Sequence, residues 1–81
     1  LQLRPDQVQA LYHVADIQYQ RNNYQSAKNF LDRFTKLAAP NAEVLWLALR
    51  IERKLGDENS AASYAQQLRK IESETRTRDN L

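Results

Sequence analysis

The side chains that could support metal or acid–base chemistry are few in this 81-residue chain. His13 is the single histidine, and Asp16 is the one carboxylate close to it on the same predicted helix. A zinc site needs about three or four donor side chains at suitable spacing, so we interpret His13 as a polar helix residue. No hydroxyl is placed where His13 would activate it for nucleophilic attack. We therefore predict no catalytic site, no metal site and no cofactor.

The composition argues against several other classes of protein. The chain has no cysteine, which removes disulfides, thiolate metal sites and a cysteine nucleophile. Its formal net charge is only +2, and basic and acidic residues alternate along the predicted helices. Such mixed charge indicates a solvated helix face more than a nucleic-acid surface. The sequence contains neither a signal peptide nor the run of about 20 apolar residues that crosses a bilayer.

Aromatic and charged residues recur at helical spacing within residues 8–21 and 42–55. This pattern indicates a surface that binds a partner and does not indicate a catalytic site. Aromatic and arginine side chains dominate the energetics of protein interfaces, so a surface that combines them could hold a peptide. An alternative stays open, in which Trp46 packs back on the neighbouring helix and the charges are simply solvated. Asp16 and Arg50 could also form an ion pair, worth only about 0–1 kcal/mol if exposed. The candidate groove residues are Tyr12, Asp16, Tyr19, Trp46, Arg50 and Arg53, flanked by Gln9, Gln20, Glu43 and Lys54.

Four helices must position these residues, since apolar side chains recur every three or four positions in four segments. The segments span 8–21, 24–37, 42–55 and 58–73. Their expected boundary signals are Asp6 as first N-cap, Asn22-Asn23 as stop and second cap, Pro40-Asn41 as break and third cap, and Gly56-Asp57 as stop and fourth cap. The predicted buried residues are Val8, Leu11, Tyr12, Val14, Ala15 and Ile17; Ala27, Phe30, Leu31, Phe34 and Leu37; Val44, Leu45, Leu47, Ala48, Leu49 and Ile51; Ala61, Ala62, Tyr64, Ala65, Leu68 and Ile71.

The two halves of the chain repeat with a period of 34 residues, as between Ala27 and Ala61. Other apolar pairs share this spacing: Leu11 with Leu45, Ala15 with Leu49, Phe30 with Tyr64, Phe34 with Leu68, and Leu37 with Ile71. A fixed period of this length is typical of stacked helix–turn–helix units. The short connections make neighbouring helices antiparallel. An alanine at 27 and 61 would let two helices approach closely.

These residues resemble two tetratricopeptide repeats. The first match is carried by Leu11, Val14, Ala15, Tyr19, Tyr24, Ala27, Phe30, Phe34 and Pro40, and the second by Leu45, Ala48, Leu49, Gly56, Asp57, Ala61, Tyr64 and Leu68. The resemblance implies an all-α, right-handed superhelix of antiparallel hairpins, with about four helices plus a partial N-terminal turn. It departs at Gln18, Glu52 and Glu58, where the repeat usually has aromatic residues. We expect a thinner core in repeat two.

A narrower resemblance is carried by residues 41–50, Gly56-Asp57, Ala61-Ala62-Ser63-Tyr64 and 67–70. This segment is similar to the C-terminal repeats of the pilotin family of type IV pilus biogenesis, PilF or PilW. The resemblance implies a lipoprotein on the periplasmic side of the outer membrane, which supports assembly or localisation of the secretin. The lipid anchor would lie outside this chain, so membrane attachment rests on the resemblance alone.

The leading hypothesis is thus a non-catalytic protein–protein interaction module. The alternative is a structural role, in which these repeats cap a longer array or self-associate through exposed ends. A metal hydrolase is the least supported class. The chain begins at Leu1 without an initiator Met, and we expect a fragment of something longer. The expected divisions are 1–7, the end of a preceding repeat; 8–41, repeat one; 42–73, repeat two; and 74–81, a frayed or disordered tail.

Overall fold

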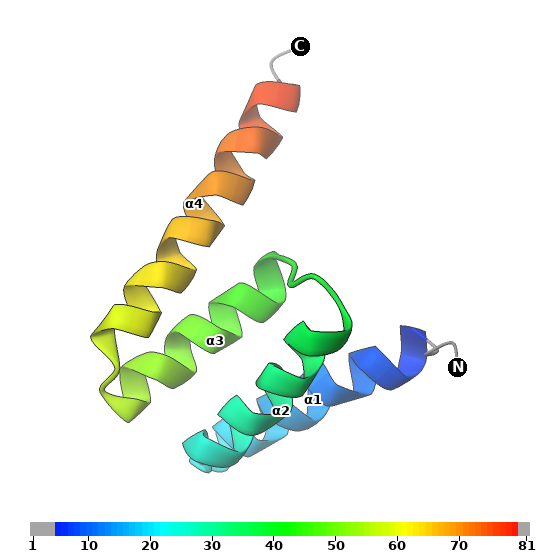
Figure 1. The fold of residues 1–81 in the computed structure, drawn as a ribbon, viewed down its shortest axis with the longest axis vertical. Helices are drawn as coiled ribbons and strands as arrows, with labels where there is room; N and C mark the ends of the chain where they lie inside the picture. Colours follow the sequence, from blue (N-terminus) through cyan, green and yellow to red (C-terminus); the bar gives the residue numbers. More distant parts are fainter. Residues whose placement is uncertain (1–4, 80–81) are drawn as a thin grey trace.

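The computed structural model describes residues 5–79 and consists of four helices joined by short turns. They are α1 (Pro5–Gln20), α2 (Tyr24–Leu37), α3 (Ala42–Leu55) and α4 (Glu58–Asp79). Within the described range there is no strand. The predicted all-α class of helix hairpins is therefore confirmed (Figure 1).

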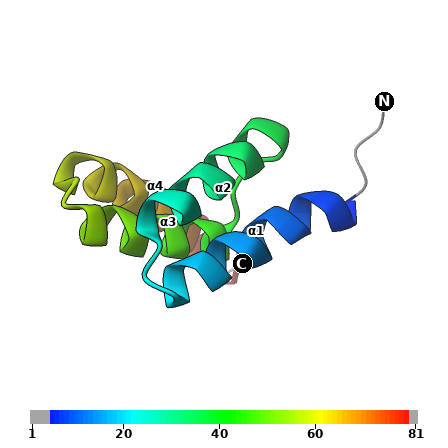
Figure 2. The same ribbon diagram turned by 90° about the horizontal axis from the view of Figure 1, so that it is seen from below.

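The helices form two antiparallel hairpins, and α3 joins them. α1 packs against α2, and α3 packs against α4. α3 also lies against α2 and touches α1, whereas α4 packs on α3 alone among the described helices. Figure 2 shows α1 and α3 on one side of the molecule, and α2 and the first turns of α4 on the other. The thickness of 18 Å fits two helix layers, since a helix with its side chains is about 10 Å across.

The turns end and restart the helices largely through the residues that the sequence predicts. Asn22 and Gly56 both adopt the left-handed conformation, with φ of 68° and 81°. The Oδ1 atom of Asn41 accepts a hydrogen bond from the Val44 backbone N–H at 2.9 Å, which caps α3. Asp57 caps α4, because its carboxylate accepts from both the backbone N–H and the hydroxyl of Ser60. These hydrogen bonds lower the Asp57 pKa, with the backbone bond contributing most.

Two predicted caps are wrong. Asp6 lies inside α1, because the helix already begins at Pro5. Proline suits the first helical position, where its missing N–H would have no partner anyway. Asn23 stands at the N-cap position of α2 but makes no side-chain capping bond. Its amide Nδ2 instead donates to Oε1 of Gln18 at 2.9 Å, which ties the turn back onto α1.

The last helix extends beyond its predicted end. Its apolar stripe stops near Ser73, yet α4 continues to Asp79. The segment after Ser73 contains neither Gly nor Pro before Asp79, so no residue type interrupts the backbone hydrogen bonds there. The rest of the expected tail, residues 80–81, and residues 1–4 of the expected preceding repeat lie outside the described residues.

Two apolar clusters make the core, and α3 contributes to both. The larger cluster joins the first hairpin to one face of α3: Ala15, Ala27, Leu31, Phe34, Val44, Leu47, Ala48 and Ile51. The smaller one lies between α3 and α4: Leu45, Leu49, Ala61 and Leu68. Both alanines of the 34-residue register are thus buried, Ala27 in the larger cluster and Ala61 in the smaller.

Three residues predicted to be buried are exposed, namely Ile17, Leu37 and Ala62. Ile17 and Leu37 are large apolar side chains, and each is nearly half exposed. Helical spacing alone cannot separate a face that meets a neighbouring helix from one that meets solvent. Each of the three lies on a face that no described helix covers.

A buried ion pair links the two hairpins and was not predicted. Glu52 on α3 is only 2% exposed, and its carboxylate lies 3.2 Å from Lys28 Nζ on α2. Glu52 follows Val44 and Ala48 at four-residue steps, so helical spacing could have indicated its burial. Among the described residues, no buried side-chain polar atom lacks a hydrogen-bond partner.

Candidate partner-binding surface

Three charged side chains of α1 and α3 act electrostatically on the Tyr12 hydroxyl. Tyr12 is half-buried on α1. Burial raises the pKa of the Tyr12 hydroxyl; the carboxylates of Glu43 and Asp16 raise it further, and Arg50 opposes them. These charges therefore lie close enough to Tyr12 to act on it electrostatically. We call Tyr12, Asp16, Glu43 and Arg50 the α1–α3 strip.

The strip presents charges without neutralising them in an ion pair. Asp16 accepts a hydrogen bond from the Gln20 amide at 3.2 Å, one turn along the same helix. In the described part of the chain the one ion pair within 4 Å is that of Lys28 and Glu52, so the Asp16–Arg50 pair considered from the sequence does not form. Arg50 is exposed. Its guanidinium keeps its donors available for a carboxylate or a backbone carbonyl.

Tyr19, a predicted groove residue, belongs to a different environment at the turn between α1 and α2. Its ring lies 5.6 Å from that of Tyr24 in a tilted arrangement. The Tyr24 hydroxyl donates to Oδ1 of Asn22 at 2.8 Å, and Lys54 Nζ lies 6.0 Å from the centre of the Tyr24 ring. Tyr19 therefore helps to order the first turn, and the prediction did not anticipate that role.

Trp46 and Arg53, the other two predicted groove residues, line hollows between α3 and α4. The Trp46 side chain is 46% exposed, so it lies outside the core, at the edge of the second hairpin beside residues of α4. One hollow of about 250 Å³ is bounded by Trp46, Leu49, Arg53, Ala65, Leu68, Arg69 and Glu72. Trp46 thus stands at the border between the α1–α3 strip and the second hairpin.

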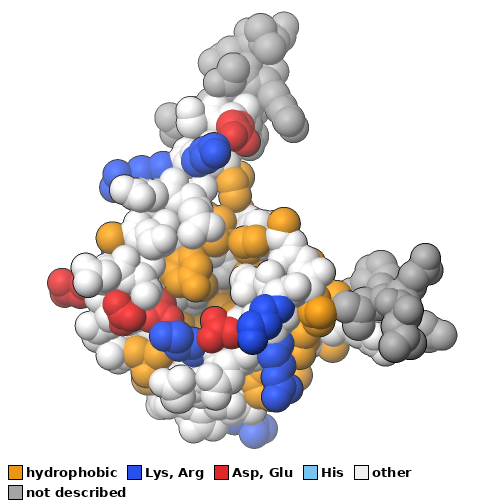
Figure 3. Space-filling model, in the orientation of Figure 1, with side chains coloured by type: hydrophobic (Ala, Val, Ile, Leu, Met, Phe, Trp, Pro, Cys, Tyr) orange, Lys and Arg blue, Asp and Glu red, His pale blue; other side chains and the backbone are white. Residues whose placement is uncertain are grey.

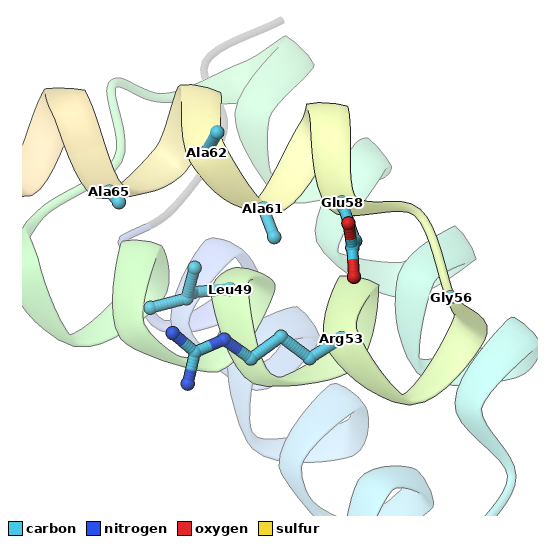
Figure 4. A pocket seen from close by; sticks show the side chains of 7 residues that line it. All are labelled: Leu49, Arg53, Gly56, Glu58, Ala61, Ala62 and Ala65. Carbon is cyan, nitrogen blue, oxygen red and sulfur yellow. The ribbon is translucent and has the colours of Figure 1, made fainter.

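A second hollow, of about 450 Å³, adjoins the first. It is lined by Leu49, Arg53, Gly56, Glu58, Ala61, Ala62 and Ala65. Figure 4 shows the Arg53 side chain extended beneath Leu49, while Ala61 and Ala65 point from α4 toward α3. Ala62 and Ala65 stand where the first hairpin has Lys28 and Leu31, so smaller side chains border this space.

The opposite layer carries a mixture of apolar and charged surface. On the face drawn in Figure 3, hydrophobic side chains gather in the hollowed centre beside α4, and acidic and basic side chains lie mixed in a row below it. No large field of one sign covers this face, in agreement with the sequence pattern.

Neither metal binding nor membrane spanning finds a structural basis in residues 5–79. His13 is exposed, and its nearest aromatic partner is the Tyr12 ring at 5.7 Å, edge-on. Among residues 7–74, whose side chains the structure describes, no three His, Cys, Asp or Glu residues are grouped so as to hold a metal ion. The four helices, as far as described, lack the combination of length and apolar character that crossing a membrane needs.

Comparisons with known proteins add one relative. No protein-family model matches the chain, and no solved structure gives a significant match. A curated protein, the Type IV pilus assembly protein PilF of Pseudomonas aeruginosa, is 31% identical over 71 residues. The match covers 88% of this chain but 28% of PilF. The chain is thus similar to a little more than a quarter of a pilus assembly protein.

Proposed function

We propose that this chain is a non-catalytic protein–protein interaction module that acts in type IV pilus assembly. The observation that carries the pilus role is the 31% identity to PilF across 88% of the chain. Two stacked helix hairpins support the interaction role, because such units form extended binding surfaces. The proposed division of the chain is repeat one over residues 8–41 and repeat two over residues 42–73.

The more specific proposal is a pilotin-like protein that supports assembly or localisation of the pilus secretin. Under it, the protein acts on the periplasmic side of the outer membrane and is held there by a lipid anchor outside this chain. This proposal draws on the resemblance of residues 41–70 to the pilotin family. It predicts a direct contact between this chain and the secretin.

The binding surface in this proposal is the α1–α3 strip with Trp46 beside it. Arg50 supplies an exposed guanidinium, Tyr12 a half-buried hydroxyl, and Trp46 an exposed aromatic face. A peptide with carboxylates and apolar side chains would match these groups, because arginine, tyrosine and tryptophan are the usual anchors of interfaces. Arg53, although predicted with them, lies in the hollow beside α4 and would contribute at the edge.

The test is direct binding of this chain to the purified secretin of the same organism, measured by biolayer interferometry. Arg50→Ala and Trp46→Ala should each weaken binding about fivefold or more, which corresponds to about 1 kcal/mol at an interface anchor. Arg33→Ala is the matched control, because Arg33 is an exposed arginine on α2, on the other layer. If the secretin does not bind, the pilotin-like role is wrong. If it binds equally well to all three variants, the α1–α3 strip is not the surface.

A further inference from the structure

The exposed face of α3 carries a carboxylate and a guanidinium on either side of an aromatic ring. Glu43, Trp46 and Arg50 follow one another at steps of three and four residues, so they form one line along the helix, which we call the α3 stripe. All three are exposed, and the residues between Trp46 and Arg50 are buried. A partner that lies along the stripe therefore meets a negative charge, an apolar ring and a positive charge in that order.

Neither charge of the α3 stripe is neutralised by an ion pair within the part of the chain that the structure describes, where the one such pair joins Lys28 to Glu52. Glu43 and Arg50 are seven residues apart, which is about 10.5 Å along the helix axis. Both act on the Tyr12 hydroxyl, with opposite effects on its pKa, so both charges lie near α1. Each remains able to bind a group of opposite charge.

Access to this face does not depend on which helix lies next to it. Trp46 and Arg50 are exposed although the first hairpin packs against α3. Tyr12 and Asp16, the residues 34 positions earlier, are only half-buried although α3 of the second hairpin lies against α1. A hairpin stacked on either side in the same way would leave part of this face open.

The spacing of the two charges fits a helical partner better than an extended one. Residues i and i+7 of an α-helix lie on one face and are about 10.5 Å apart along the axis, which is the separation of Glu43 and Arg50. On one face of an extended strand the separations are about 6.6 and 13 Å, which fit less well. Residues i+3 and i+4 of such a helix lie between the two charges and would face Trp46. Helices that bind in grooves use this pattern of anchors.

We propose that the α3 stripe binds an amphipathic helix of the partner protein that carries a basic and an acidic residue seven positions apart. The basic residue pairs with Glu43, the acidic residue pairs with Arg50, and the apolar residues between them cover Trp46. This inference rests on the proposed function, because it specifies the segment that the same binding surface takes.

Charge complementarity selects this occupant over a helix of one sign. A wholly acidic helix would place a carboxylate against Glu43, and a wholly basic helix would place a cation against Arg50. Like charges that meet at an interface suppress binding. Arg50 suits a carboxylate, because its planar guanidinium can donate two parallel hydrogen bonds. Trp46 can also attract the cation beside Glu43, since an aromatic face binds positive charge.

Three synthetic peptides test this charge pattern. They are alanine-based helices of about 18 residues, because shorter ones are marginal in water, with leucines at the two central anchor positions. At the two charged positions they carry Lys and Asp, two Asp, or two Lys. Trp46 is the single tryptophan of the chain, so its fluorescence reports binding at the stripe. At low salt, the Lys/Asp peptide should bind the wild-type chain about fivefold or more tightly than either of the others.

Charge reversal should change the preference and not merely weaken binding. Glu43→Lys should prefer the peptide with two Asp, and Arg50→Glu the peptide with two Lys. Both residues are exposed, and binding of the matching peptide shows that each variant is folded. Arg33→Glu is the matched control, since Arg33 is exposed on α2, and it should keep the preference of the wild-type chain.

Three results would overturn the proposal. They are a Trp46 fluorescence that no peptide changes, equal affinity of the wild-type chain for the Lys/Asp peptide and one of the others, and an unchanged preference in the two charge-reversed variants. The peptides do not involve the secretin, so their binding is measured separately from the pilotin-like role. A secretin that does not bind removes that role, whereas the peptide preferences decide the charge pattern that the α3 stripe recognises.

Discussion

The two hairpins carry the same apolar register but differ in how much of it is buried. In the first hairpin, Ala15, Ala27, Leu31 and Phe34 are all buried because α3 lies over them. In the second, the equivalent Leu49, Ala61 and Leu68 are buried as well, but Ala65 is half-buried, and hollows open beside it. The apolar cluster of the second hairpin is smaller than that of the first. This is expected, because Glu52 and Glu58 stand where the repeat usually has aromatic residues. The comparison shows that each hairpin buries most of its own apolar register, and that α3 completes the burial of Leu31, where the second hairpin has the smaller Ala65.

The largest expected contrast is between two isoleucines at one register position. Ile51→Ala should destabilise the fold by about 2–5 kcal/mol, because it leaves a cavity in the larger cluster. Ile17→Ala should change the free energy of unfolding by less than about 0.5 kcal/mol, as surface substitutions do. Urea unfolding of both variants at low protein concentration measures the difference. Equal losses would mean that Ile17 is as well covered as Ile51.

The buried ion pair gives the next contrast. Lys28→Ala leaves the carboxylate of Glu52 buried without its partner, and should cost about 1–3 kcal/mol. This range lies below that for a fully buried pair, because the Lys28 side chain is 32% exposed. Ala62 lies 34 residues after Lys28 and is exposed. Ala62→Lys, the reciprocal change, should therefore leave the free energy of unfolding nearly unchanged. Thermal unfolding at low and high salt checks both, and the loss in Lys28→Ala should persist in high salt.

The helix starts provide a smaller contrast. Asn41→Ala removes the side-chain acceptor of the Val44 N–H and should cost about 1 kcal/mol. Asn23→Ala removes no capping bond, so a loss of only a few tenths of a kcal/mol is expected from its contact with Gln18. Chemical denaturation of the two variants compares them. A larger loss in Asn23→Ala would show that the first turn depends on that contact.

The smallest effect is expected at alkaline pH. The hydrogen bond to Glu52 raises the pKa of Lys28 above the ordinary value of 10.5, and burial raises that of Tyr64 above 10.0. Above about pH 10, Lys28 and Tyr64 therefore keep their protons in the folded chain but lose them in the unfolded chain. Stability should accordingly be unaffected by these groups below pH 10 and fall as the pH rises beyond it. Unfolding free energies from pH 8 to 11 test this, and Lys28→Ala should flatten the decline whereas Lys36→Ala should not.

Local signals in the sequence placed the helices and most turns. The bounds of α2 and α3 match the predicted segments, since Asn41, Gly56 and Asp57 act through their own short-range chemistry. Asp6 and Asn23 show the limit of such reasoning. Each is a good capping residue, but Pro5 started α1 earlier, and Gln18 offered the Asn23 amide another partner.

The candidate binding surface was predicted only in part. The charges of Asp16 and Arg50 both act on the Tyr12 hydroxyl, because α1 and α3 are neighbours in the same layer. Tyr19 and Arg53 share a register position yet lie in different surroundings, one at an aromatic turn and one in an open hollow. The 34-residue register could not distinguish Tyr19 from Arg53, because it does not say which residues of a neighbouring helix will lie beside each of them.

The sequence by itself determined that this protein is a pair of helix hairpins with apolar faces repeating every 34 residues. Spacing, caps and breakers act within a few residues, so they are readable in one dimension. Only the tertiary structure decided that α3 would be covered on two faces, that Glu52 would be buried against Lys28, and that Ile17 would be exposed and a hollow would open beside Ala65. Those outcomes depend on which helix lies beside which, and packing between distant segments is what sets burial and charge pairing.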